Sequence, residues 1–203
     1  DSVAVGEDGP THQPIEQITN LRTTPNLHTW RPCDTVETAI AWRCAVQEQN
    51  TPSALIFTRQ NTEAQNRDAA AFANIERGGY VLRACEGRPD LILIGTGSEV
   101  ELVVAASTKL TQVGYKVQVV SMPCCEVFMA QNQVYRDEVL PPEVRTRLAV
   151  EAGHGDYWAK FVGLDGDTVS IDRYGLSAPG GEAMTILGIT ADNVITRAKA
   201  LLG

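Results

Sequence analysis

The sequence lacks any uninterrupted apolar run long enough to span a bilayer, and no charged-then-apolar signal segment stands at its start. It is also short of positive charge, because 17 lysine and arginine residues face 25 aspartate and glutamate residues, for a net charge of -8. A protein of this balance has no basic stripe with which to neutralise the phosphates of a nucleic acid. We therefore expect neither a membrane nor a nucleic acid as its partner.

Cysteines are few and lack the spacing of a disulfide framework or a metal site. There are five; the adjacent Cys124 and Cys125 make no C-x-x-C pair, and no histidine accompanies them at ligand spacing. This set predicts reduced, mostly buried thiols in a cytosol-like compartment, with an organelle as the open alternative. What remains is an ordinary globular composition of 203 residues, 43% hydrophobic and 21% charged, enough for one or two domains.

The first chemically rich segment follows directly on a short apolar run. Residues 3–5 (VAV) predict a short buried strand, and residues 8–10 (DGP) predict a tight turn. Apolar residues then recur at helical spacing in segment 14–21, behind a proline placed in the first helical turn. Asp8 and His12 are therefore expected at a strand-to-helix junction, near the carboxyl end of a strand. Open α/β sheets bind their ligands at such places.

The next part of the chain continues the alternation of strands and helices. Residues 30–32 (WRP) end a second extended piece, and residues 54–57 (ALIF) predict a buried strand. Between them, Asp34 and Glu37 have capping-box form at the start of a helix that reaches about Gln47. This order of elements is typical of an α/β fold.

We divide the chain into a first unit (residues 1–61), a polar connection (62–77) and a second unit (78–203). The second unit shows three apolar runs that predict strands, and two helical patterns that end near Gly114 and near the last residue. The three predicted strands are residues 91–94, 117–120 and 147–150. The pattern predicts a Rossmann-like three-layer α/β/α domain.

A glycine-rich turn, residues 95–98 (GTGS), separates the first of these strands from its helix. It lacks the third glycine of a dinucleotide fingerprint, because Val100 stands in that place. Capping of the helix by Ser98, with Glu101 as its capping-box partner, explains the turn. No dinucleotide site is expected here.

Several segments resemble transketolases in the family's order and at about its spacing. Residues 6–14 (GEDGPTHQP) resemble the family's corresponding run, as do the WRP segment of residues 30–32 and the RQN segment of residues 59–61. The other matching segments are residues 93–100 (LIGTGSEV), 120–123 (VSMP), 150–153 (VEAG) and 177–179 (SAP). The resemblance covers essentially the whole chain.

The resemblance implies a fold and an activity. Residues 1–61 would be the end of an incomplete thiamine-diphosphate-binding (pyrimidine) domain, followed by a complete transketolase C-terminal domain. The intact family enzyme is a homodimer of the pentose phosphate pathway that moves a two-carbon ketol unit between sugar phosphates. It uses thiamine diphosphate and Mg²⁺ or Ca²⁺. The segments that bind these cofactors have no counterpart here, so cofactor-binding and metal-binding residues are not expected, and the chain is expected to be inactive without the missing N-terminal part.

Three residues are candidates for substrate contact. His12 can exchange a proton near neutral pH, and the resemblance implies a catalytic residue that contacts the ketose near its reacting carbons. A carboxylate such as Asp8 accepts several hydrogen bonds, and the resemblance places it on a sugar hydroxyl. Arg59 follows an apolar strand, and the resemblance places it on the sugar phosphate. From the residues alone, a locally satisfied histidine, a turn aspartate and a surface ion pair are the alternatives.

Two other functions remain open at this stage. One is a dihydroxyacetone synthase, a relative with a different acceptor, and the other is a non-catalytic α/β module for dimerisation or regulation. A pure interaction module has no need for Asp8, His12 and Arg59 together. The incomplete first sheet also exposes an edge and an apolar face, which predicts poor autonomous stability for residues 1–61.

Overall fold

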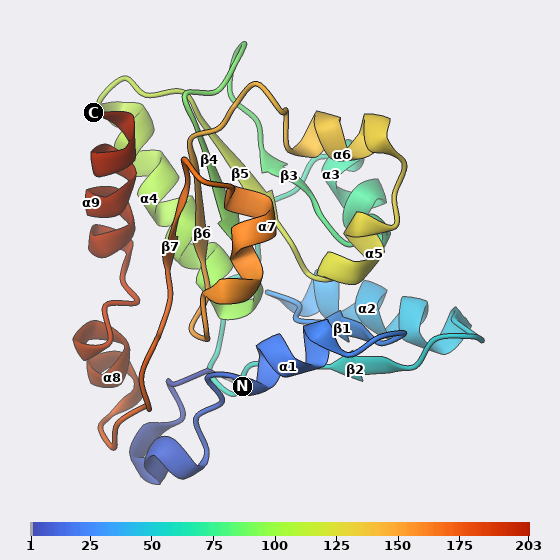
Figure 1. Ribbon diagram of the computed structural model, residues 1–203, viewed down its shortest axis with the longest axis vertical. Coiled ribbons are helices and arrows are strands. Elements are labelled where there is room, and N and C mark those ends of the chain that lie inside the picture. The colour runs from blue at the N-terminus through green and yellow to red at the C-terminus, as the bar shows by residue number, and fades with distance from the viewer. Residues whose placement is uncertain (1) are drawn as a thin grey trace.

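The computed structural model describes residues 2–203 and divides their strands between two sheets (Figure 1). In the first unit and the connection, the elements in chain order are the 3-10 helix η1 (Gly6–Thr11), α1 (Gln17–Thr23), β1 (His28–Trp30), α2 (Thr35–Gln47), β2 (Ser53–Leu55), α3 (Ala69–Asn74) and the 3-10 helix η2 (Ile75–Arg77). In the second unit they are β3 (Tyr80–Arg83), β4 (Leu91–Gly95), η3 (Gly97–Glu99), α4 (Val100–Gln112), β5 (Val117–Ser121), α5 (Cys125–Met129), α6 (Gln133–Val139), β6 (Arg147–Val150), η4 (Asp156–Trp158), α7 (Ala159–Val162), β7 (Asp167–Val169), α8 (Gly180–Ile186) and α9 (Ala191–Leu202). Across the described residues, no helix combines the length and the apolar character needed to cross a bilayer.

The small sheet of the first unit is built largely as its sequence predicts. β1 and β2 run parallel over three residue pairs. α2 begins where expected, because the Asp34 carboxylate accepts a hydrogen bond from the Glu37 backbone N–H at 3.0 Å. The strand predicted at residues 54–57 starts one residue earlier and ends at Leu55.

The strand predicted at residues 3–5 is wrong. Within the described residues this segment pairs with no strand, although Val3 is fully buried. An apolar triplet does not form a strand by itself, because its backbone N–H and C=O groups need a neighbouring strand as partner. The chain instead makes η1, which is kinked at Gly9 (φ 71°). α1 begins only at Gln17, so Pro14 precedes the helix rather than occupying its first turn.

The five strands of the second unit form a sheet in the order β3-β5-β4-β6-β7, in which β3 runs antiparallel to β5 and the other pairs are parallel. α4 and α9 cover one face, and α5, α6 and α7 lie on the other (Figure 1). The expected three-layer α/β/α arrangement is therefore confirmed.

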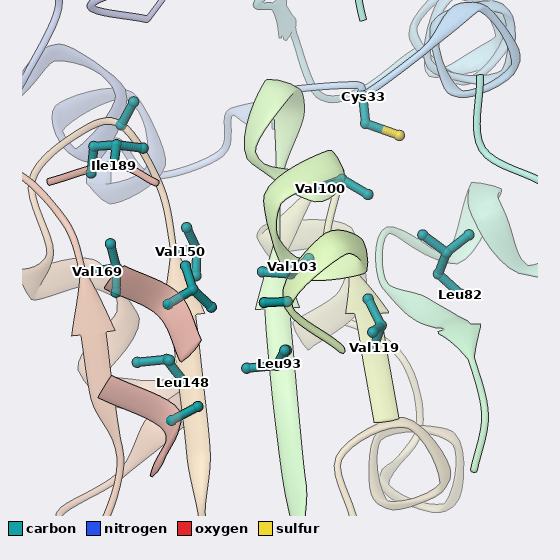
Figure 2. Packing of buried hydrophobic residues seen from close by; sticks show 14 of the residues in the cluster. Cys33, Leu82, Leu93, Val100, Val103, Val119, Leu148, Val150, Val169 and Ile189 are labelled. Carbon is teal, nitrogen blue, oxygen red and sulfur yellow. The ribbon is translucent and has the colours of Figure 1, made fainter. Parts of the chain in front are cut away.

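Two hydrophobic cores result from the alternation of side chains along each strand. On β4, Leu91 and Leu93 belong to the core under α4 and α9, whereas Ile92 and Ile94 belong to the aromatic-rich core on the opposite face. Figure 2 shows part of the first core, where Val103 of α4 lies over the strands. Runs that are apolar on both faces are what a central parallel sheet requires.

The helix after β4 begins differently from the prediction. The Ser98 hydroxyl donates to the Glu99 carboxylate at 2.7 Å and caps no backbone N–H. Ser98 lies inside the 3-10 turn η3, where the backbone is already helical, and Thr96 holds the N-cap position. The capping box assigned to Ser98 is therefore wrong, while the helix itself is present from Val100 to Gln112.

The carboxyl ends of β4 and β5 face the first unit. The Arg31 backbone N–H, just after β1, donates to the carbonyl of Pro123 beyond β5 at 2.7 Å. The Gly97 N–H, beyond β4, donates to the carbonyl of Arg31 at 3.0 Å. Open α/β sheets usually bind ligands at this edge. Here the first unit covers this edge of the sheet, so a ligand site at the edge has to involve the first unit itself.

We expect proteases to cleave the first unit before the second. Two strands of three residues make a sheet at the limit of stability. Trp42 and Phe57 stack beside it at 6.1 Å, and they remain 52% and 38% exposed. Limited proteolysis followed by mass spectrometry measures the two lifetimes. Survival of the first unit for as long as the second would contradict this expectation.

Candidate functional site

Two of the three predicted site residues meet in an ion pair. Arg59, which follows β2, donates from Nη1 to Oδ2 of Asp8 in η1 at 3.2 Å. The two side chains are 70% and 41% exposed, so water screens the pair and its contribution to stability is at most about 1 kcal/mol. A phosphate or hydroxyl group arriving from solvent can therefore replace either partner at little cost.

His12 lies at the end of the same segment, with its side chain exposed. Its Nδ1 is 2.9 Å from the hydroxyl oxygen of Thr11, and that hydroxyl donates its single proton to the carbonyl of Asp8 at 3.1 Å. We therefore assign Nδ1–H of His12 as the donor to Thr11. The lone pair of the neutral ring is then on Nε2, which is the arrangement a proton acceptor needs.

The setting of these residues differs from the strand-to-helix junction expected for them. Asp8 lies within η1 and His12 caps its carboxyl end, with no strand immediately before them in the described chain. The backbone N–H of His12 donates to the carbonyl of Gly9 at 3.1 Å, which closes the turn. The structure thus brings Asp8 and Arg59 into contact and places His12 on the same short segment.

A buried ion pair joins α1 to the end of β6. Both terminal nitrogens of Arg22 donate to the Glu151 carboxylate, at 2.6 and 2.9 Å, and each side chain is 1% exposed. Trp158 donates to the same carboxylate from Nε1 at 2.8 Å. Burial alone would raise the pKa of Glu151, but Arg22, Arg31 and these hydrogen bonds outweigh it and hold the pKa below its usual value. Glu151 is therefore an anion inside the protein.

A second buried pair fills the glycine-rich turn. Nη1 of Arg31 donates to the Glu99 carboxylate at 2.6 Å and to the carbonyl of Thr96 at 2.8 Å. A Cβ atom at position 97 would lie 2.6 Å from Cζ of Arg31, so only glycine permits this close approach. The turn is therefore filled by the protein's own guanidinium.

A third cluster ties the connection to both units. Arg67 binds the Asp34 carboxylate at 2.7 Å, while Tyr80 and Ser121 donate to the Glu37 carboxylate at 2.7 and 2.6 Å. Burial, reinforced by the Glu37 charge, raises the pKa of Tyr80 above its usual value, so this hydroxyl stays a hydrogen-bond donor. The cluster fixes the start of α2 against the sheet of the second unit.

Sequence reasoning missed all three clusters. It used segments 30–32 and 150–153 for strand ends and for the resemblance, and it gave the side chains of Arg22, Arg31 and Glu151 no role. The available signal was a charged residue directly after a strand, as for Arg31 after β1 and Glu151 after β6. Such a residue can point to solvent or to another element of the fold, and the sequence does not distinguish the two.

The described side chains form no metal site. Among them, no three or more histidine, cysteine, aspartate or glutamate side chains are grouped so as to hold a metal ion. The glycine-rich turn, which is the feature best suited to a phosphate, is filled by Arg31. The chemistry that this part of the chain can supply is the binding of hydroxyl groups by Asp8, of an anion by Arg59, and proton exchange by His12.

Two family models match this chain. The family model described as "Transketolase, pyrimidine binding domain" matches residues 1–65, and the one described as "Transketolase-like TK C-terminal domain" matches residues 78–190. Transketolase 1 of Escherichia coli (strain K12) is 55% identical over 202 residues, which cover 100% of this chain and 30% of that protein.

Two solved structures are similar over the full length of the chain. A transketolase from Leishmania mexicana has a TM-score of 0.93 and 39% identity, with 29% of that chain covered. A transketolase from Pichia stipitis in complex with sedoheptulose 7-phosphate has a TM-score of 0.91 and 36% identity, also with 29% of that chain covered. The chain thus spans about three tenths of the length of the relatives that it matches.

Proposed function

Because this chain belongs to the transketolase family, we propose that it provides the substrate-binding side of a longer enzyme. That enzyme would transfer a two-carbon ketol unit reversibly from a ketose phosphate, such as xylulose 5-phosphate, to an aldose phosphate. The observation that carries this proposal is the contact of Arg59 with Asp8, which lies on the same short segment as His12. Transketolases depend on thiamine diphosphate, which supplies the carbanion chemistry when it is bound.

Each of the three residues has a role that follows from its chemistry. Arg59 grips the phosphate of the sugar through its forked N–H groups, and Asp8 accepts hydrogen bonds from a sugar hydroxyl. His12 contacts the ketose near its reacting carbons, where Nε2 accepts a proton or a hydrogen bond. The sugar phosphate displaces the exposed Asp8–Arg59 pair, because that pair is weak in water.

The setting of the chain in the intact enzyme is part of the same proposal. The segments that bind thiamine diphosphate, and Mg²⁺ or Ca²⁺, lie outside this chain, and it has no ketol-transfer activity without them. The intact enzyme is a homodimer of the pentose phosphate pathway. The five cysteines form no disulfide in the described chain, which supports a reducing, cytoplasmic compartment.

We also propose domain boundaries at residues 61 and 78. The division of the strands into two sheets and the family matches at residues 1–65 and 78–190 both support a break between these positions. The dihydroxyacetone synthase and the non-catalytic module are not favoured, because the relatives are named transketolases and cover the whole chain.

The proposal is tested in a chimera in which this chain replaces the matching 202 residues of the Escherichia coli transketolase 1. We expect the chimera to transfer ketol units. Arg59→Ala should raise its apparent KM for a ketose phosphate by about tenfold to a hundredfold, because a hydrogen-bonded charge pair with the phosphate is lost. Steady-state kinetics with phosphorylated and unphosphorylated ketoses measure this change.

The control is Arg43→Ala, because Arg43 is a similarly exposed arginine that pairs with Glu76. It should leave the KM unchanged. An Arg59→Ala chimera with an unchanged KM for the phosphorylated ketose would remove Arg59 from the substrate site.

A further inference from the structure

The segment that carries Asp8 and His12 is held by the second unit rather than by a strand of its own. Gln13, which is 4% exposed, donates from Nε2 to the carbonyl of Val3 at 2.8 Å and to the carbonyl of Leu176 at 2.9 Å. A side-chain amide has two N–H hydrogens, so both are used. One hydrogen bond joins Gln13 to Val3, near the start of the chain. The other joins it to Leu176, in a loop 163 residues further along the chain.

That loop, residues 175–180, packs closely on this segment at two places, Gly9 and Gln13. A Cβ atom at position 175 would lie 1.7 Å from Oε1 of Gln13, so the loop backbone rests directly on the amide. A Cβ atom at position 9 would lie 3.3 Å from Cβ of Ser177, so the kink of η1 rests on the same loop. In Figure 1 the blue N-terminal turn lies beside the chain leading into α8.

We propose that Gln13 and the loop 175–180 position the substrate-binding segment, so that the second unit takes part in substrate binding without touching the sugar. This inference rests on the proposed function of Asp8 and His12. Gln13 is the direct chain neighbour of His12, and Gly9, whose carbonyl accepts the His12 backbone N–H, packs against Ser177. A displacement of about 1 Å at a reacting group is enough to reduce catalysis strongly. Gln13 is therefore a positioning residue.

Two variants of the chimera reach this contact from opposite sides. Gln13→Met keeps the length of the side chain and removes both donors, while Gly175→Ala puts a methyl group where the amide oxygen lies. We expect each to raise the KM for xylulose 5-phosphate by about tenfold, with the KM for thiamine diphosphate unchanged. Gly175→Ala decides the matter if Gln13→Met does not fold, because it leaves residue 13 as it is.

The coupling between Gln13 and His12 distinguishes a positioning role from a purely structural one. If Gln13 acts by placing His12, each variant should add at most a twofold change when it is made in a His12→Ala background. The matched control is Gln118→Met, because Gln118 is also a buried glutamine that donates to a backbone carbonyl, that of Val139, at 2.9 Å. It should lower the thermal stability and leave the KM unchanged.

The proposal is overturned if both variants keep the KM within twofold, or if their full effect persists in the His12→Ala background. These outcomes differ from a failure of the proposed function. That function fails if His12→Ala itself leaves ketol transfer by the chimera unchanged, whatever the variants at positions 13 and 175 do.

Discussion

Glu151→Leu should lower the free energy of unfolding of the chain by about 3–5 kcal/mol, because it leaves the Arg22 guanidinium charged and buried without its main partner. Glu151 accepts three hydrogen bonds, two from Arg22 and one from Trp158, and all three are lost together. Arg22 cannot escape by losing its proton, since an arginine stays charged in proteins. The effect should therefore lie near the upper end for a single substitution.

Urea denaturation of the 203-residue chain measures this loss. The matched control is Glu76→Leu, which breaks an ion pair with Arg43 whose side chains are about half exposed, and it should cost less than about 1 kcal/mol. The double variant Arg22→Met with Glu151→Leu should recover part of the loss, because no buried charge is left alone. A cost for Glu151→Leu no greater than that of Glu76→Leu would contradict the assignment of a buried, ionised pair.

The Glu151 carboxylate also makes the free energy of unfolding depend on pH. The pKa of Glu151 is lower in the folded chain than its ordinary value of about 4.3. Its contribution is therefore complete above that ordinary value and is lost as the pH falls through the lower, folded value. The urea midpoint of the unmodified chain should fall more steeply than that of Glu151→Leu as the pH drops below that ordinary value. Parallel curves for the two proteins would show that Glu151 does not titrate in this way.

His12→Ala should lower kcat/KM of the chimera for ketol transfer by about a hundredfold or more. A positioned group that exchanges a proton with the reacting centre contributes about 10²–10⁴-fold, and His12 is exposed to solvent with Nε2 as its acceptor. The KM for thiamine diphosphate should stay the same, because the proposed contact of His12 is with the sugar and not with the cofactor. Steady-state kinetics at saturating cofactor separate the two effects.

Two further variants test whether the loss of activity is specific to His12. Thr11→Val removes the hydroxyl that orients Nδ1 of His12 and should lower kcat/KM by less than His12→Ala does. His154→Ala changes a partly exposed histidine whose Nε2 lies 3.4 Å from Oδ1 of Asp172, and it should leave the kinetics unchanged. An equal loss for His12→Ala and His154→Ala would mean that His12 has no special place in the reaction.

The central strands could be predicted from the sequence, while the edge strands could not. β4, β5 and β6 are almost completely buried and consist mainly of Ile, Leu, Val and Ala, and the predicted ranges match them to within one residue. β3 (YVLR) and β7 (DTV) each pair with a single neighbour, and each combines buried with half-buried residues. Runs of three or four residues that are buried only in part do not stand out from a loop.

The sequence by itself determined the class of the fold and the central strands, because these follow from local patterns that act over a few positions. The choice of Asp8, His12 and Arg59 as candidates for sugar-phosphate contact came from the resemblance to transketolases. Only the tertiary structure decided that Asp8 meets Arg59 across 51 residues, that Gln13 holds a loop 163 residues away, and that Arg22 and Glu151 bury their charges together. Each of these contacts depends on how elements far apart in the sequence pack. For Gln13 and for the Arg22–Glu151 pair the physical reason is burial, because a buried polar or charged side chain is stable only where a partner compensates it.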